Sequence, residues 1–183
     1  MAVSQRESEP VFPTDREDQL VAGLAALAIA IHILEAAFPS PLPGVKPGLA
    51  NVVTVVVYLR YGLRVAAWVA LLRVLVGSLL IGTFLSPTFL LSATGAVAAI
   101  VVLGVIGGIG RSAVGAVGLS VAAALAHMSG QIWVAYSLFI PHPALLSLAP
   151  VLLTAALVFG CVSGLIAASV DSLLRSRGNP THE

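Results

Sequence analysis

Long apolar stretches alternate along the chain with short segments rich in proline, glycine and charge. Between Leu20 and Val170 the apolar pattern is interrupted by six charged side chains, which are Glu35, Lys46, Arg60, Arg64, Arg73 and Arg111. The hydrocarbon core of a bilayer is about 30 Å thick, and a helix needs about 20 apolar residues to cross it. These roughly 150 residues therefore predict about five to seven membrane crossings.

Six crossings fit the pattern best. The predicted helices are Gln19–Phe38, Leu49–Tyr61, Val65–Gly82, Leu91–Gly110, Gly115–Phe139 and Leu148–Val170. The second reaches only about 20 Å at about 1.5 Å per residue, so we expect it to be tilted, extended into Pro47–Gly48 or shielded by its neighbours. The predicted fold is an all-α integral membrane protein, a six-helix bundle whose second helix is short or tilted.

The distribution of lysine and arginine predicts the orientation of this bundle. With six crossings, seven of these residues lie on one side, namely Arg6, Arg16, Arg60, Arg64, Arg111, Arg175 and Arg177, and Lys46 lies on the other. Cytoplasmic loops retain Lys and Arg, whereas acidic residues contribute little to orientation. We therefore expect a multi-pass protein of the cytoplasmic (inner) membrane with both termini in the cytoplasm.

The two ends of the chain differ from the apolar middle. Residues 1–18 carry five acidic residues against two arginines, which is the opposite of the basic region that precedes a signal peptide's apolar segment. The first helix is therefore expected to remain uncleaved. We expect residues 1–18 to form a disordered cytoplasmic tail, residues 19–170 the membrane domain, and residues 171–183 a second cytoplasmic tail.

Composition excludes several function classes. The chain is 58% hydrophobic and 9% charged, whereas soluble domains carry about 25% charged residues. A formal net charge of +1 leaves no basic surface for nucleic acid. The single cysteine, Cys161, excludes an intrachain disulfide and a cysteine-rich metal site. The sequence predicts no cofactor and no metal.

Prolines gather in the predicted outer loops, Pro39–Gly48, Thr83–Leu90 and Ile140–Ser147. Seven of the eleven prolines lie there, and four of them lie in the first loop. Because proline fixes φ, such loops lose less entropy when they close over a ligand. We expect stiff outer caps, although prolines also simply end helices.

A few polar residues fall at membrane depth, where an ionisable group faces the bundle interior or a wet cavity. The candidates for a substrate-binding site open to the outside are Glu35, Lys46, Asn51, Arg73, His127 and Gln131. His127 and Gln131 are four residues apart and share a helix face, and Lys46 lies in the loop above. With Glu35, Lys46 and Arg73 all charged, the sum is +1, which favours an anionic or zwitterionic ligand.

Each candidate also has a purely structural interpretation. Glu35 and Arg73 form a structural ion pair in that case, and His127 is a buried histidine bonded to a neighbouring helix. Asn51 is then a helix cap. His32, one turn before Glu35, is expected to be a packing residue, with a place in the lining of the site as the lesser alternative. Arg60, Arg64 and Arg111 are expected to set the topology.

Small residues recur at every fourth position along some helices. Such a stripe, called a seam here, lets helices approach closely in lipid. They are Ala22, Ala26 and Ala30 in the first helix, Ala122, Ala126 and Gly130 in the fifth, and the pairs Gly104/Gly108 and Gly160/Gly164. Packing inside the bundle explains such seams. The functional alternative is docking of another membrane subunit, for which the seam of Ala22, Ala26 and Ala30 is the best candidate.

Three runs carry a family resemblance: residues 41–51 (PLPGVKPGLAN), 71–84 (LLRVLVGSLLIGTF) and 126–131 (AHMSGQ). They resemble the Gx transporter family, which is also catalogued as heptaprenyl diphosphate synthase component I. That family is grouped by fold with the S components of energy-coupling factor transporters. The grouping implies six helices, a substrate held near the outer surface under loops one, three and five, and an alanine-rich first helix that docks a coupling subunit.

The enzyme name of the family requires different chemistry. Chain-elongating prenyl synthases hold diphosphates through magnesium bound to aspartate-rich motifs, whereas residues 19–182 contain only two acidic residues, Glu35 and Asp171. We therefore expect a noncatalytic component at most. The sequence also has no GxxxxGK[ST] loop for ATP, so ATP-driven uptake requires separate ATPase and coupling subunits.

Three hypotheses remain open from the sequence. The first is a substrate-binding subunit for uptake of a small metabolite, energised by partner subunits. The second is an accessory membrane component of prenyl diphosphate synthesis. The third is a scaffold without a ligand. An ion-driven solitary carrier, with Glu35 or His127 taking the proton, is a lesser variant of the first.

Overall fold

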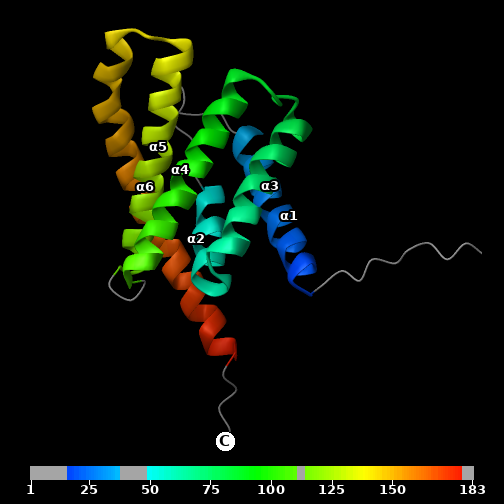
Figure 1. The fold of residues 1–183 in the computed structure, drawn as a ribbon. Coiled ribbons are helices and arrows are strands. Elements are labelled where there is room, and N and C mark those ends of the chain that lie inside the picture. Colours follow the sequence, from blue (N-terminus) through cyan, green and yellow to red (C-terminus); the bar gives the residue numbers. More distant parts are fainter. Residues whose placement is uncertain (1–15, 38–48, 111–113, 179–183) are drawn as a thin grey trace, which may run out of the picture.

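The computed structural model describes residues 16–37, 49–110 and 114–178, which form a helical bundle (Figure 1). The helices are α1 (Arg16–Ala37), α2 (Leu49–Tyr61), α3 (Leu63–Ile81), α4 (Pro87–Gly110), α5 (Ala116–Val134), the π-helix η1 (Ala135–Phe139) and α6 (Pro143–Gly178). Lys46, the predicted loop Pro39–Gly48 and Arg111 lie outside the described residues.

In the described part, five helices are long and apolar enough to cross a membrane, and all except α2 belong to this group. The 13 residues of α2 rise about 20 Å, less than the hydrocarbon thickness of about 30 Å. The predicted fold class, a six-helix membrane bundle with a short second helix, is confirmed.

In this bundle, large apolar side chains are exposed and charged side chains are buried, which is the reverse of a soluble protein. Leu80, Leu138 and Leu165 are 65%, 66% and 61% exposed, whereas Arg73 and Glu35 are buried with 6% and 8% exposed. Exposed leucines are stable in lipid, and charged groups in a membrane face the interior of a bundle. The protein is therefore a multi-pass membrane protein.

Each long helix packs against the next in the order α1, α3, α4, α5, α6, and α2 contacts α1, α3, α5 and α6. A cluster of small and medium side chains fills the interior. Tyr58 of α2 is its largest buried member, and its hydroxyl donates to the carbonyl oxygen of Leu103 on α4 at 3.0 Å. This bond satisfies a buried hydroxyl and fixes α2 against α4.

The first residues of α1 and the last residues of α6 lie at one end of the bundle in Figure 1, called the terminal end here. The α2–α3 turn lies at the same end, whereas the turns α3–α4 and η1–α6 lie at the opposite end. The opposite end corresponds to the predicted outer side.

A single residue, Gly62, joins α2 to α3. Its φ is +88°, a conformation that suits glycine, and its amide donates to the Tyr58 carbonyl at 3.1 Å. Asn51 and Arg73 each lie eleven residues from Gly62. At about 1.5 Å per residue, both lie about 16 Å from this turn, in the membrane interior.

Two predicted outer loops are shorter than expected. We expected Thr83–Leu90 and Ile140–Ser147, but α4 begins at Pro87 and α6 begins at Pro143. Both prolines occupy the first helical position, where the missing N–H is not needed and φ already suits a helix. These two prolines therefore start helices, and the prediction that they stiffen loops was wrong.

Side chains next to these prolines cap the helices. The Ser86 hydroxyl accepts from the Phe89 amide at 3.4 Å, and Nδ1 of His142 accepts from the Ala144 amide at 3.1 Å. Such caps satisfy amides that the first turn of a helix leaves without partners. At the other boundaries, α1 starts at Arg16 and α6 continues to Gly178, so both helices extend beyond the predicted crossings.

Candidate functional site

Arg73 lies in the middle of α3 on a buried stripe that also contains Ala66, Ala70 and Gly77. Its guanidinium interacts electrostatically with Glu35 of α1 and with His127 of α5. The Nε atom is buried and has no hydrogen-bond partner among the described residues. The structure thus brings three of the predicted site residues, from three helices, into one electrostatic cluster in the bundle interior.

Glu35 is buried two residues before the end of α1 at Ala37. Its carboxylate stabilises the charge on Arg73, as expected for the structural ion pair and for a ligand site alike. A carboxylate accepts from several donors, whereas a guanidinium offers five N–H groups in a planar fork. Of these groups, Nε is the buried Arg73 donor for which the described residues offer no hydrogen-bond partner.

His127 and Gln131 face each other along α5, and the Gln131 amide nitrogen lies 3.1 Å from the His127 Nε2 atom. The shared helix face expected from their spacing is therefore present. The His127 ring packs on Gly95 of α4, where an added Cβ would lie 2.7 Å from Nε2. The His127 Nδ1 atom is buried and has no hydrogen-bond partner among the described residues.

Asn51 is half-buried in the first turn of α2, at the same distance from the Gly62 turn as Arg73. The structure therefore places its backbone at the depth of the Arg73 cluster, while no described contact joins the two side chains. Lys46 was predicted as a lid over the site, and it lies outside the described residues. Its role remains a prediction.

A small hollow of about 50 Å³ is lined by residues of α1, α3, α4 and the α3–α4 turn. That turn lies at the end of the bundle opposite the termini (Figure 1). We call this hollow the outer hollow. It is lined by His32, Val74, Ser78, Ile81, Thr83, Thr88, Phe89 and Ser92. Apart from His32, none of these residues was singled out from the sequence, because scattered serines and threonines in apolar helices form no motif.

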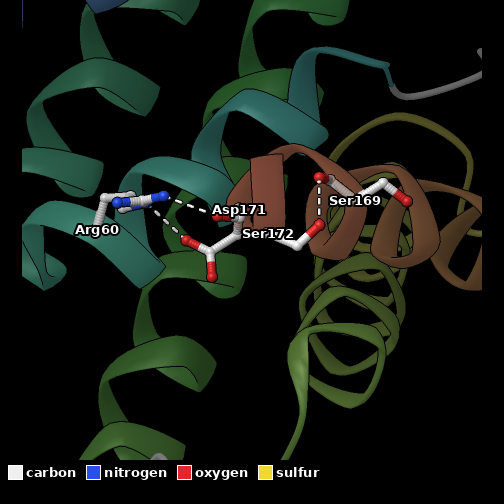
Figure 2. A network of polar contacts seen from close by, with 4 residues as sticks. All are labelled: Arg60, Ser169, Asp171 and Ser172. Carbon is white, nitrogen blue, oxygen red and sulfur yellow. Dashed lines mark hydrogen bonds and ion pairs between the residues drawn. The ribbon is translucent and has the colours of Figure 1, made fainter. Parts of the chain in front are cut away.

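At the terminal end, Arg60 and Asp171 form an ion pair between α2 and α6 (Figure 2). The Arg60 Nε atom lies 2.6 Å from Oδ1 of Asp171, and Nη2 donates to the Asp171 main-chain carbonyl at 2.7 Å. The adjacent Ser172 hydroxyl donates to the Ser169 carbonyl, one turn earlier, at 2.8 Å. Arg60 was predicted to set topology, which stays a prediction; the structure shows that it pairs with α6 at Asp171.

The small-residue seams take two different positions. Gly160 and Gly164 pack on α5, where a Cβ at Gly164 would lie 2.6 Å from the Val117 Cα. In contrast, Ala22, Ala26 and Ala30 are exposed on α1, and a Cβ at Gly23 would meet nothing within 4 Å. The glycine pair therefore serves internal packing, whereas the alanine seam faces away from the bundle.

Comparison with known proteins yields one match. No curated protein and no solved structure matches this chain. A family model described as heptaprenyl diphosphate synthase component I matches residues 24–170. This range runs from α1 to α6 and includes Glu35, Arg73, His127 and Gln131. The match spans about four fifths of the sequence, and the chain therefore belongs to the heptaprenyl diphosphate synthase component I family.

Proposed function

We propose that this protein is a membrane subunit that binds a small metabolite with an anionic group and contributes to its uptake together with separate energising subunits. The observation that carries the proposal is Arg73, buried in a membrane-spanning bundle with its Nε atom unpartnered in the described part. A buried donor without an acceptor costs about 1–3 kcal/mol, and more in a charged group. A bound carboxylate or phosphate removes that cost with charge-assisted hydrogen bonds.

The histidine beside Arg73 supports the same site. If Nε2 of His127 accepts from the Gln131 amide, then Nδ1 carries the proton and lacks an acceptor. In the other neutral tautomer, Nδ1 lacks a donor. The His127 ring also hydrogen-bonds the Gly95 backbone, so Nδ1 is the ring atom for which a polar ligand would supply the missing hydrogen bond.

The exposed seam of Ala22, Ala26 and Ala30 supports a partner subunit. Small residues let the backbone of a second helix approach closely in lipid, and this stripe does not face the protein's own bundle. We propose that it docks a transmembrane coupling protein, as the resemblance to S components implies. ATPase subunits then complete the transporter.

Native mass spectrometry of the full chain, purified in mild detergent, tests the proposal. Wild-type protein is expected to carry a small-molecule adduct that Arg73→Ala loses. Arg64→Ala is the control, because Arg64 is exposed near the α2–α3 turn. Wild-type protein without an adduct, or an adduct that survives Arg73→Ala, contradicts the proposal.

A second candidate function rests on the family match. In this case the protein is a noncatalytic membrane component of heptaprenyl diphosphate synthase, since residues 19–182 contain only two carboxylic side chains, Glu35 and Asp171, too few for the paired motifs that bind magnesium diphosphates. Deletion of the gene would then shorten or abolish the polyprenyl side chain of the quinones. Unchanged quinones in the deletion strain exclude this function and leave the first proposal in place.

A further inference from the structure

The outer hollow contains hydroxyl groups that the protein leaves unused. Thr83, Thr88 and Ser92 all line the hollow. Hydroxyls in membrane helices ordinarily bond to a carbonyl one turn earlier. Among the described residues, Ser92 inside α4 does not make this bond, whereas Thr83 precedes α4 and Thr88 lies in its first turn, where the helix offers no carbonyl one turn earlier. All three hydroxyls can therefore bond to a group inside the hollow.

Neighbouring hydroxyls show the ordinary arrangement. Thr94, two residues after Ser92 on α4, donates to the Leu90 carbonyl at 2.7 Å, and Ser78 of α3 donates to the Leu75 carbonyl at 2.9 Å. Ser78 also lines the hollow, and its oxygen still has accepting capacity. The contrast between Ser92 and Thr94 shows that bonding to the helix backbone is possible in this part of α4.

The residues that line the hollow range from exposed to buried. Thr88 is exposed, whereas Ser78 is 5% exposed. Val74, which follows Arg73 in sequence, also lines the hollow. Ser78 lies five residues beyond Arg73 on α3, which is about 7.5 Å along the helix axis.

The size of the hollow limits what it accepts. About 50 Å³ holds a few water molecules or one small polar group, since a single water needs about 10–15 Å³. His32 is the one ionisable residue among those lining it, and none of them carries a carboxylate, lysine or arginine. Its hydroxyls therefore suit an uncharged group, such as a hydroxyl, a carbonyl or an amide, that both donates and accepts.

We infer that the outer hollow is a second subsite of the ligand-binding site: Thr83, Thr88 and Ser92 hold an uncharged polar group of the ligand whose anionic group Arg73 holds. The ligand class is a small carboxylate or phosphate that also carries a hydroxyl, a carbonyl or an amide. This inference rests on the proposed function and adds a specificity element to it.

Removing the hydroxyls tests the subsite with the same copurified adduct as the probe. In Thr88→Val and Ser92→Ala, we expect the ratio of adduct-bearing to free protein to fall about fivefold per hydroxyl, the equivalent of a typical net hydrogen bond. Thr94→Val is the matched control, because it removes a hydroxyl of α4 that does not line the hollow. We expect the control to keep the wild-type ratio.

The outcomes separate the subsite from the function as a whole. An adduct that Arg73→Ala loses but both hollow variants retain at the wild-type ratio overturns the subsite and leaves the proposed function. A wild-type protein without an adduct overturns both. Equal losses in Thr94→Val and in the hollow variants overturn the subsite as well, because they indicate a general effect on α4.

Thiol labelling tests whether the hollow is open to water, independently of any ligand. In a Cys161→Ser background, Ser92→Cys is expected to react with a membrane-impermeant thiol reagent at least about tenfold faster than Thr94→Cys, since a thiol in lipid stays protonated and unreactive. The adduct, where present, slows the reaction at Ser92→Cys. Equal rates at the two positions overturn the inference.

Discussion

Two groups of charged residues are arranged differently in this protein. At the terminal end, Arg60 uses Nε and Nη2 on the carboxylate and the carbonyl of the same residue, Asp171. In the interior, Arg73 has the charge of Glu35 nearby but keeps a buried N–H without a partner in the described part. The first arrangement links two helices, and the second is the one that we propose to bind a ligand.

At the residue scale, we predict that Asp171→Asn lowers the free energy of unfolding by about 2 kcal/mol, between the values for exposed and buried ion pairs. The two side chains are 26% and 12% exposed, so the loss is expected to lie between those limits. Thermal unfolding in detergent measures it, with Arg64→Gln as an exposed control.

A double-mutant cycle with Arg60→Gln isolates the contribution of the pair. We expect the double variant Arg60→Gln/Asp171→Asn to lose less stability than the sum of the two single losses. Strictly additive losses contradict the idea that this pair holds α6 against α2.

The sequence predicted the interior residues better than the ion pair. Glu35, Arg73, His127 and Gln131 stand out because each lies at a depth where a polar group is costly. Arg60 and Asp171 lie 111 residues apart and close to the membrane boundary, where charges are ordinary. Their pairing depends on how α2 packs on α6, and the sequence around either residue does not reveal that packing.

At the element scale, the packing of α5 on α6 depends on glycine. A Cβ at Gly164 would lie 2.6 Å from the Val117 Cα, a backbone atom that cannot move aside alone. We predict that Gly164→Ala lowers stability by about 1–3 kcal/mol through overpacking. The check is thermal unfolding in detergent.

Gly108→Ala provides the matched control. An added Cβ at Gly108 meets nothing within 4 Å, and alanine in a helix is favoured over glycine by about 0.5–1 kcal/mol. This variant is therefore expected to be as stable as the wild type or slightly more stable. A Gly164→Ala protein with the same stability as Gly108→Ala contradicts the described helix contact.

The alanine seam on α1 allows a prediction about assembly. A bulky Ala26→Trp side chain on this exposed stripe is expected to leave the isolated protein folded and to prevent association with a coupling subunit and its ATPases. Co-purification followed by peptide mass spectrometry measures this, with Val101→Trp on the exposed face of α4 as control. Unchanged recovery of the ATPases with Ala26→Trp, or their absence from wild-type preparations, counts against the docking proposal.

The positions of the helices were largely predictable, because an apolar segment that is long enough to cross the bilayer predicts a membrane helix. The short α2 was predicted with the bounds that the structure has, Leu49–Tyr61. The starts of α4 and α6 were placed several residues too late, because proline suits a loop and the first position of a helix equally well. Sequence alone does not distinguish the two, whereas the caps at Ser86 and His142 do.

At the scale of the whole molecule, the six helices place both ends of the described bundle on one side (Figure 1). The lysine and arginine distribution predicts that this is the cytoplasmic side. In a Cys161→Ser background, Ile140→Cys is therefore expected to react with an impermeant thiol reagent in intact cells. Ser172→Cys, exposed near the other end, should react only after the membrane is permeabilised; the reverse labelling contradicts the orientation.

The central claim is that the buried Arg73 cluster holds a small anionic ligand, and an experimental structure of the purified full chain tests it most directly. A cryo-electron microscopy map in which side chains and ligand are resolved is expected to show non-protein density within hydrogen-bond distance of the Arg73 guanidinium, next to His127. A map in which protein groups satisfy every Arg73 donor, and no density other than protein fills the space between α3 and α5, contradicts the claim.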